Sequence, residues 1–221
     1  MAIFNTVYGG EPKWKPWSNT IVYYPLNWNA NDESWNGKNG TASNITWDSW
    51  WDNGCAYFNW NAYISIPSLW STNNNATFSF WVNSNQNVSN WWDFLCINNS
   101  SDNEWFTLMN DSRRFDVQTY KSWYSPSNHY STNNVCDGTW HYIAVTVSWT
   151  NFSVYIDWTL DITFTWSYWI PSLDVTRMWM HPNWSSNKYT GYIDTLIIEK
   201  VCWTADEVAN YYNKTKKNYW L

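Results

Sequence analysis

One segment of the sequence concentrates the side-chain types that recognise sugars. Residues 121–130 combine aromatic rings with amide, imidazole and hydroxyl groups, and the candidate ligand-binding residues are Trp123, Tyr124, Asn128, His129 and Tyr130. Aromatic faces pack on a sugar ring, while polar groups bond its hydroxyls. We predict an exposed loop that binds a glycan; the alternative is an exposed loop without a ligand. Arg114 is added as a candidate, with Arg113 and Trp105 as residues that the fold could bring nearby.

The carboxylates do not form a recognisable catalytic pair. Glycoside hydrolysis needs two carboxyl groups that flank the scissile bond, about 5–10 Å apart. No strand-like run carries a closely spaced pair, and the acidic residues Asp32, Glu33, Asp102 and Glu104 lie in loop-like sequence. The three histidines form no recognisable Ser/His/Asp arrangement. The sequence therefore predicts a protein that is not an enzyme.

Three further polar residues invite a functional interpretation. Asp194 interrupts an apolar strand and is a candidate calcium ligand, because Ca²⁺ takes carboxylate oxygens; the alternative is a carboxylate that bonds backbone amides. His141 follows Trp140, and we favour a strand residue whose ring bonds a neighbouring polar group over a catalytic base. Asp157 is interpreted as a turn residue.

Composition excludes several classes of protein. Charged residues make up 14% of the 221 residues and the net charge is −6, which argues against nucleic-acid binding. No run of 18 apolar residues exists, so no membrane span is expected, and no signal peptide is visible at Met1. The polar, aromatic-rich composition is typical of a protein located outside cells, on a cell surface or in a virion.

The four cysteines lack the spacing of a zinc site. They are compatible with two disulfides in any of three connectivities or with buried thiols. Cys55 and Cys96 lie in apolar strand contexts, and we predict that both are free and buried.

The periodicity predicts one all-β domain. Residues 1–18 are expected to be a flexible tether, and residues 19–221 a single domain. Phe78, Phe80 and Val82 alternate with polar residues, and similar runs recur between turn signals. Residues 55–58 and 62–66 flank Asn59-Trp60 and are predicted to pair as a hairpin. Thr204 and Glu207 form a capping box, which predicts one short C-terminal helix.

Tryptophan occupies positions at which turns require glycine. The chain has 23 Trp and only 7 Gly, and several Trp directly follow Asn or Asp, at positions 28, 60, 91, 158 and 184. A type I′ turn needs positive φ, and each bulky residue held there costs about 1–3 kcal/mol. We therefore hypothesise that many Trp are glycine in the native protein, as when UGA encodes glycine but is translated as tryptophan. The alternative is a surface that is rich in tryptophan.

An opening strand and loop at residues 23–41, a central strand at residues 138–146, and a closing strand and helix at residues 189–208 follow one another in the sequence. In this order they resemble the laminin G-like jelly-roll domains of the concanavalin A-like lectin/glucanase superfamily. The resemblance spans residues 20–213. The most specific segment is Gly138-Thr139-Trp140-His141-Tyr142-Ile143-Ala144-Val145-Thr146, and Val154-Tyr155-Ile156-Asp157-Trp158 resembles a further family strand when Trp158 is read as glycine.

This resemblance implies an antiparallel two-sheet jelly-roll β-sandwich with a short C-terminal helix. It implies non-catalytic recognition of a glycan or glycosylated surface, with or without calcium. Related jelly rolls pair a closing-strand carboxylate with oxygens of the first loop, which here implies a metal site of Asp194, Asp32 and Asn36. The alternative function is a structural or adhesion module that binds protein partners in a cell-surface or virion tail assembly.

Peptide mass spectrometry of native material tests the glycine hypothesis. We expect glycine masses at positions 28, 60 and 158, because these positions carry turn signals. Trp81 and Trp140 serve as internal controls, because both lie in strand-like sequence and are expected to be tryptophan. Tryptophan masses at the three turn positions would contradict the hypothesis.

Overall fold

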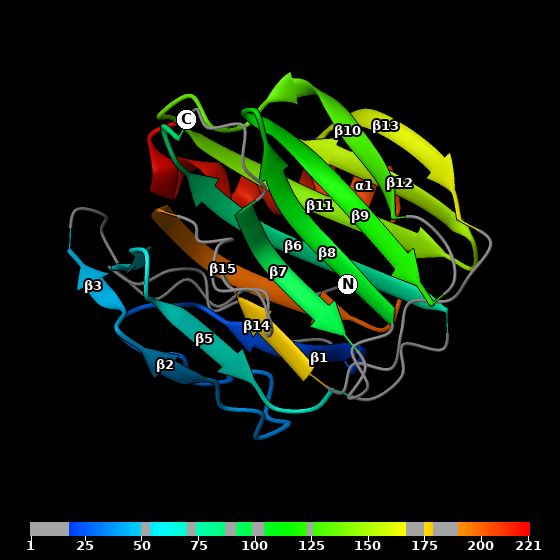
Figure 1. Ribbon diagram of the computed structural model, residues 1–221. Coiled ribbons are helices and arrows are strands. Elements are labelled where there is room, and N and C mark those ends of the chain that lie inside the picture. Colours follow the sequence, from blue (N-terminus) through cyan, green and yellow to red (C-terminus); the bar gives the residue numbers. More distant parts are fainter. Residues whose placement is uncertain are drawn as a thin grey trace.

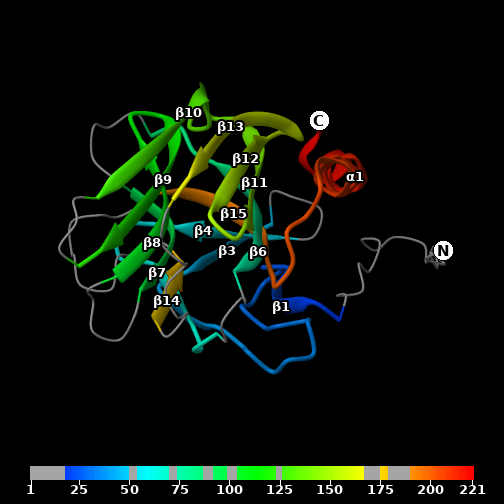
Figure 2. The same ribbon diagram turned by 90° about the vertical axis from the view of Figure 1, so that its right-hand side faces the viewer.

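Two antiparallel sheets packed face to face form the body of the protein (Figures 1 and 2). The computed structural model describes residues 18–49, 54–69, 74–86, 92–98, 104–122, 126–166, 175–178 and 190–221. The predicted tether, residues 1–18, lies outside these ranges except for its last residue. The predicted two-sheet β-sandwich is confirmed.

The first sheet has eight strands within the described residues, in the order β13-β12-β11-β6-β15-β4-β3, and β1 also pairs with β15. Its strands are β1 (Thr20–Tyr24), β3 (Thr46–Asp48), β4 (Cys55–Phe58), β6 (Asn75–Asn83), β11 (Trp140–Ser148), β12 (Asn151–Ile156), β13 (Thr159–Thr165) and β15 (Gly191–Glu199). The second sheet has seven described strands in the order β10-β9-β8-β7-β14-β5-β2. Its strands are β2 (Thr41–Ser43), β5 (Tyr63–Ile66), β7 (Trp92–Asn98), β8 (Glu104–Asp111), β9 (Arg114–Lys121), β10 (Ser127–Asn134) and β14 (Val175–Met178).

The main core lies between the two sheets. Phe78 and Phe80 of β6 face Phe106 and Phe115 of the seven-stranded sheet, and the rings of Phe78 and Phe106 lie 5.2 Å apart. All four side chains are at most 1% exposed. The predicted alternation in β6 is therefore confirmed, since Phe78 and Phe80 point inward while Trp81 points to the opposite face.

A second aromatic cluster covers the outer face of the eight-stranded sheet. Helix α1 (Ala205–Thr215) and the 3-10 helix η1 (Lys216–Tyr219) lie on this face (Figure 2). The ring of Trp81 stacks on Tyr219 at 3.9 Å, and Trp140 and Tyr142 belong to the same cluster. Both bonds of the predicted capping box between Thr204 and Glu207 are present. No helix among the described residues is long and apolar enough to cross a membrane.

The predicted hairpin around Asn59-Trp60 is wrong. Strands β4 and β5 belong to different sheets, and the turn between them carries the chain from one sheet to the other. The turn is closed by a hydrogen bond from the Ala62 N–H to the Asn59 carbonyl at 2.9 Å. The alternating pattern of each strand only requires one apolar face. Either sheet can supply the partner for that face.

Several described turns place tryptophan in the left-handed region. Trp28, Trp35, Trp149, Trp158 and Trp220 have φ between 56° and 72°. All five side chains are at least 46% exposed. Trp60 does not share this backbone conformation, because it is absent from the positive-φ residues. Trp91 and Trp184 lie outside the described residues.

All four cysteines are free thiols in the structure. Cys55 and Cys96 are both buried, which confirms the expectation for these two residues. Burial raises the pKa of Cys136 to about 12, so its thiol stays protonated at neutral pH.

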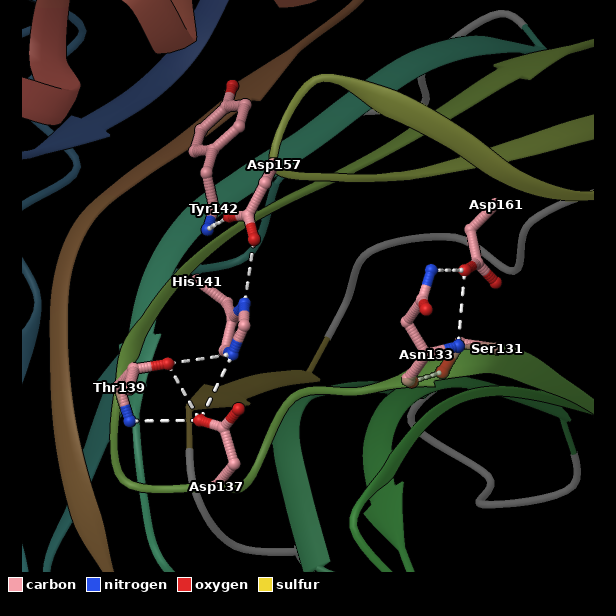
Figure 3. Close-up of polar contacts among 8 residues, drawn as sticks. All are labelled: Ser131, Asn133, Asp137, Thr139, His141, Tyr142, Asp157 and Asp161. Carbon is pink, nitrogen blue, oxygen red and sulfur yellow. Dashed lines mark hydrogen bonds and ion pairs between the residues drawn. The ribbon is translucent and has the colours of Figure 1, made fainter. Parts of the chain in front are cut away.

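His141 of β11 joins two turns at one end of the eight-stranded sheet (Figure 3). Its Nδ1 lies 2.8 Å from Asp157 Oδ2, and its Nε2 lies 3.2 Å from Asp137 Oδ1. Asp157 also accepts a hydrogen bond from the Tyr142 N–H at 2.8 Å. Asp157 and Trp158 both have positive φ, so this clamp fixes a β12–β13 turn that the backbone alone would disfavour.

The geometry around His141 superficially matches a hydroxyl–histidine–carboxylate triad, because Thr139 Oγ1 lies 3.1 Å from Nε2. However, the Thr139 hydroxyl donates a hydrogen bond to Asp137 Oδ1 at 2.7 Å. Burial lowers the pKa of His141, but the hydrogen bonds and charges of Asp157 and Asp137 outweigh burial and raise it. Both ring nitrogens of His141 thus lie within bonding distance of carboxylates, and the Thr139 hydroxyl donates to Asp137, so we interpret the cluster as a structural clamp.

Asp161 of β13 closes the gap between the edge strands of the two sheets. It accepts hydrogen bonds from the backbone N–H groups of Thr132 at 2.6 Å and Asn133 at 3.2 Å. The Asn133 side chain adds a third bond at 2.7 Å (Figure 3). Edge donors of β10 are thereby satisfied, which protects this edge from pairing with another chain.

Substitution His141→Gln tests the clamp. A raised folded-state pKa stabilises the protein fully below the unfolded pKa of about 6.5, and this contribution is lost as pH rises through the folded pKa. We therefore expect the loss of unfolding free energy, on the order of 1–2 kcal/mol, to be larger at pH 5.5 than at pH 8.5, as measured by urea unfolding.

His129→Gln is the matched control, for which we expect the opposite pH dependence of the loss of unfolding free energy. Burial lowers the pKa of His129, so its contribution is reduced at acidic pH, and this variant should cost less at pH 5.5 than at pH 8.5. An equal loss for His141→Gln at both pH values would contradict the clamp.

Candidate functional site

The outer face of the seven-stranded sheet carries a chain of polar side chains across neighbouring strands. The Trp105 indole Nε1–H of β8 donates to Gln118 Oε1 of β9 at 3.0 Å. The Gln118 Nε2 donates in turn to Asn128 Oδ1 of β10 at 2.9 Å. Trp105 also stacks on Tyr120, with ring centroids 3.7 Å apart. This face is turned toward the viewer in Figure 1.

Strand pairing explains why these residues meet. Leu108 pairs with Val117, and both belong to the core between the sheets. Because side chains alternate along a strand, the neighbouring Thr107 and Gln118 must face outward. Gln118 pairs with Asn128, so Asn128 faces outward as well. The core thus determines which side chains reach the outer face.

Arg114 and Tyr130 extend the same face. The Arg114 guanidinium lies 4.4 Å from the centre of the Tyr130 ring, and both side chains are partly exposed. Tyr130 pairs with Asp116, two residues along each strand from the Gln118–Asn128 pair, so it faces the same side of the sheet. We call the group of Trp105, Gln118, Asn128, Tyr130 and Arg114 the outer-face site.

His129 does not join the outer-face site. It pairs with Val117, which faces the core, and its ring stacks on Phe164 of β13 at 3.7 Å. The predicted loop 121–130 is also partly wrong, because β10 begins at Ser127. Trp123 and Tyr124 lie outside the described residues. The run of polar residues in β10 lacks the apolar alternation that would have identified a strand from the sequence.

Two buried carboxylates lie beside the outer-face site. Asp93 of β7 and Asp116 of β9 both pair with Met109 of β8, from opposite sides. Both carboxylates are 0% exposed. Among the described residues, neither oxygen of Asp93 has a hydrogen-bond partner, and Asp116 Oδ2 has none. Asp116 Oδ1 accepts the His129 N–H at 2.7 Å. Burial raises the pKa of each carboxyl to about 7.

This pair is not predictable from the sequence, because the two residues are 23 positions apart. One signal was present, since Asp116 lies between Phe115 and Val117 in a strand-like run. A charged residue at that position has to face away from the core. Which other carboxylate shares its face depends on strand order, and one sequence does not reveal strand order.

The predicted calcium ligands of the first loop already have hydrogen-bond partners. The Asp32 carboxylate accepts N–H groups from Tyr23 at 3.0 Å, Ser34 at 2.9 Å and Lys38 at 2.9 Å. The Asn36 amide donates to the carbonyls of Thr20 and Ile21. Both side chains therefore fasten the first loop to strand β1.

Asp194, the third predicted calcium ligand, is buried on the side of the eight-stranded sheet that η1 covers. Its Oδ2 accepts the Tyr219 hydroxyl at 2.7 Å. In the part of the chain that the structure describes, no group of three or more His, Cys, Asp or Glu side chains gathers in a metal-binding arrangement. Calcium binding by Asp194, Asp32 and Asn36 stays a prediction.

Solved structures with the same architecture include several binding domains. Domain 4 of AbnA, an extracellular arabinanase of family GH43 from Geobacillus stearothermophilus, was solved with arabinotriose. It is 19% identical to this chain, with a TM-score of 0.73, and the alignment covers 87% of this chain and 97% of that domain. At this identity the likeness establishes the fold.

Two toxin domains show the same likeness over part of their length. The binding domain of Paraclostridial Mosquitocidal Protein 1 is 14% identical, with a TM-score of 0.73, and the alignment covers 88% of this chain and 52% of that one. The binding domain of botulinum neurotoxin DC, solved with rat synaptotagmin II, is 14% identical with a TM-score of 0.73, at 88% and 51% coverage. This chain therefore spans about half the length of these toxin domains.

The family is shown by the sequence itself. A search of curated proteins returned no match. A laminin G-like family model, described as concanavalin A-like lectin/glucanases superfamily, matches residues 58–209, which is more than half of the chain. The chain belongs to the concanavalin A-like lectin/glucanase superfamily.

Proposed function

We propose that this protein is a non-catalytic carbohydrate-binding module and that its ligand lies on the outer-face site. The observation that carries the proposal is the hydrogen-bonded chain from Trp105 through Gln118 to Asn128, next to partly exposed aromatic rings. The buried Gln118 amide orients the Asn128 side chain, whose amide offers further donor and acceptor positions to sugar hydroxyls. Tyr130 supplies an aromatic face for a sugar ring.

The arabinanase domain supports this proposal as an analogy of fold. That domain was solved with arabinotriose, and almost its entire length aligns with this chain. The likeness makes arabinotriose a reasonable first ligand to test. The particular sugar is set by the side chains of the outer-face site, which differ between proteins that share a fold.

Burial of Asp93 and Asp116 supports a binding role over a catalytic one. A glycosidase acid must come within hydrogen-bond distance of the glycosidic oxygen. Both carboxylates are 0% exposed, so a bound sugar cannot reach them without rearrangement of the surrounding side chains. A polar binding face of this kind suits a protein that acts outside cells, on a cell surface or in a virion.

We propose that ligand binding at the outer-face site is independent of calcium. Asp194 contacts Tyr219, on the opposite side of the sandwich from the outer-face site. Calcium bound by Asp194, Asp32 and Asn36 would instead stabilise the first loop. The alternative function, a structural or adhesion module that binds protein, predicts an ordered oligomer in size-exclusion chromatography and no glycan binding.

We further propose that the five exposed, left-handed tryptophans, at positions 28, 35, 149, 158 and 220, are glycine in the native protein. Glycine adopts positive φ without the steric cost that a Cβ brings. By contrast, Trp81, Trp140 and Trp203 are at most 3% exposed and fill the aromatic cluster beneath α1, which supports tryptophan at these three positions in the native protein. Under this proposal the exposed tryptophans contribute nothing to sugar binding.

Titration calorimetry with arabinotriose and a wider glycan array tests the proposed function. We expect Tyr130→Ala and Asn128→Ala each to weaken binding by about tenfold, which corresponds to ~1.4 kcal/mol. The matched control is Tyr57→Ala, which removes a partly exposed tyrosine of β4 in the eight-stranded sheet and should leave binding unchanged.

The same titration in calcium and in chelator separates the two candidate sites. Binding that survives chelation and fails in the Tyr130 variant supports the outer-face site. Binding that is lost on chelation, with Tyr130→Ala still active, would contradict it and indicate the first loop. Release of reducing sugar from any bound glycan would contradict the non-catalytic role.

A further inference from the structure

The carboxylates of Asp93 and Asp116, which are buried beside the outer-face site, affect which glycans the site accepts. This inference rests on the proposed function. Asp93 and Asp116 lie in the strands on either side of β8. Neighbouring strands are about 4.8 Å apart, so the two backbones are about 10 Å apart. Asp116 pairs with Tyr130 of the outer-face site, so a ligand there would lie beside Asp116, and Asp93 lies two strands farther across the sheet.

These two carboxylates lack a compensating partner. Neither belongs to an ion pair among the described residues, whereas Glu104 of the same sheet pairs with Lys121 at 3.2 Å. The charge of Arg114, itself a member of the outer-face site, lowers the pKa of Asp116, and the charge of Asp111 acts in the opposite direction. Asp93 has no comparable cation, since burial is the cause that shifts its pKa.

We propose that Asp93 and Asp116 make the outer-face site selective for neutral glycans and exclude chains that carry uronate, sialic acid or sulfate. In a low-dielectric environment like charges repel strongly, and ordinary salt screens buried charges weakly. A neutral sugar does not meet this repulsion and retains its hydroxyl contacts with Asn128. The two carboxylates act on specificity through their field and need no direct contact with the ligand.

The experiment is a glycan array at pH 8 with neutral, uronate-containing, sialylated and sulfated members, probed with the wild type and the Asp93→Asn/Asp116→Asn double variant. This pH lies above the raised pKa of about 7 of both carboxyls, which favours their charged form. We expect the wild type to bind neutral members and to bind anionic members at least about tenfold more weakly. The double variant should retain neutral ligands and gain anionic ones.

Two controls keep the result specific. Asp206→Asn removes one carboxylate from the exposed first turn of α1, beyond the eight-stranded sheet, and should leave selectivity unchanged. The urea unfolding midpoint of the double variant should equal or exceed that of the wild type, because an amide costs less to bury than a carboxylate. The amide oxygen introduced at position 116 would still accept the His129 N–H, as the Asp116 carboxylate does in the wild type.

Each outcome decides the question. Stronger wild-type binding to anionic members, or a folded double variant that gains none, overturns the selectivity proposal while the proposed carbohydrate-binding function stands. No binding to any member by either protein overturns the proposed function, and the selectivity proposal with it. Neutral-only binding by the wild type, extended to anionic members in the double variant, supports both.

Discussion

The packing of β8 and β9 against the core determines both faces of the seven-stranded sheet. Phe106 and Leu108 of β8 are fully buried between the sheets, as is Val117 of β9. A shift of one residue in either strand would expose these side chains and bring polar groups into the core. The burial that stabilises the sandwich therefore also holds Gln118 on the outer face, beside Trp105.

The outer face of the seven-stranded sheet also buries two carboxylates, which destabilise the fold locally. Burying a carboxylate oxygen without a donor costs free energy, and Asp93 and Asp116 beside Met109 together have three such oxygens among the described residues. The aromatic core between the sheets and the second cluster beneath α1 offset this cost. Buried polar groups that weaken a fold are common at functional sites, which is why the outer face of this sheet is the more informative side of the molecule.

Local features were predictable from the sequence, and long-range ones were not. The alternation around Phe80 and the capping box at Thr204 depend on neighbouring residues, and both were predicted correctly. The pairing across Asn59 was wrong because turn chemistry does not reveal which sheet the next strand joins. Asp93 and Asp116 were missed for the same reason. Asn128 was predicted as a ligand-binding residue from its type, whereas its strand and its bond to Gln118 required the structure.

Heteronuclear NMR of nitrogen-labelled protein during addition of a glycan shows directly whether the ligand lies on the outer-face site. The indole N–H of Trp105 and the side-chain amides of Gln118 and Asn128 report on the outer-face site, because they form one hydrogen-bonded chain. We expect these resonances to shift together and in proportion to ligand occupancy. Shifts confined to the first loop around Asp32, or to the cluster beneath α1, with these side-chain resonances unchanged, would contradict this expectation.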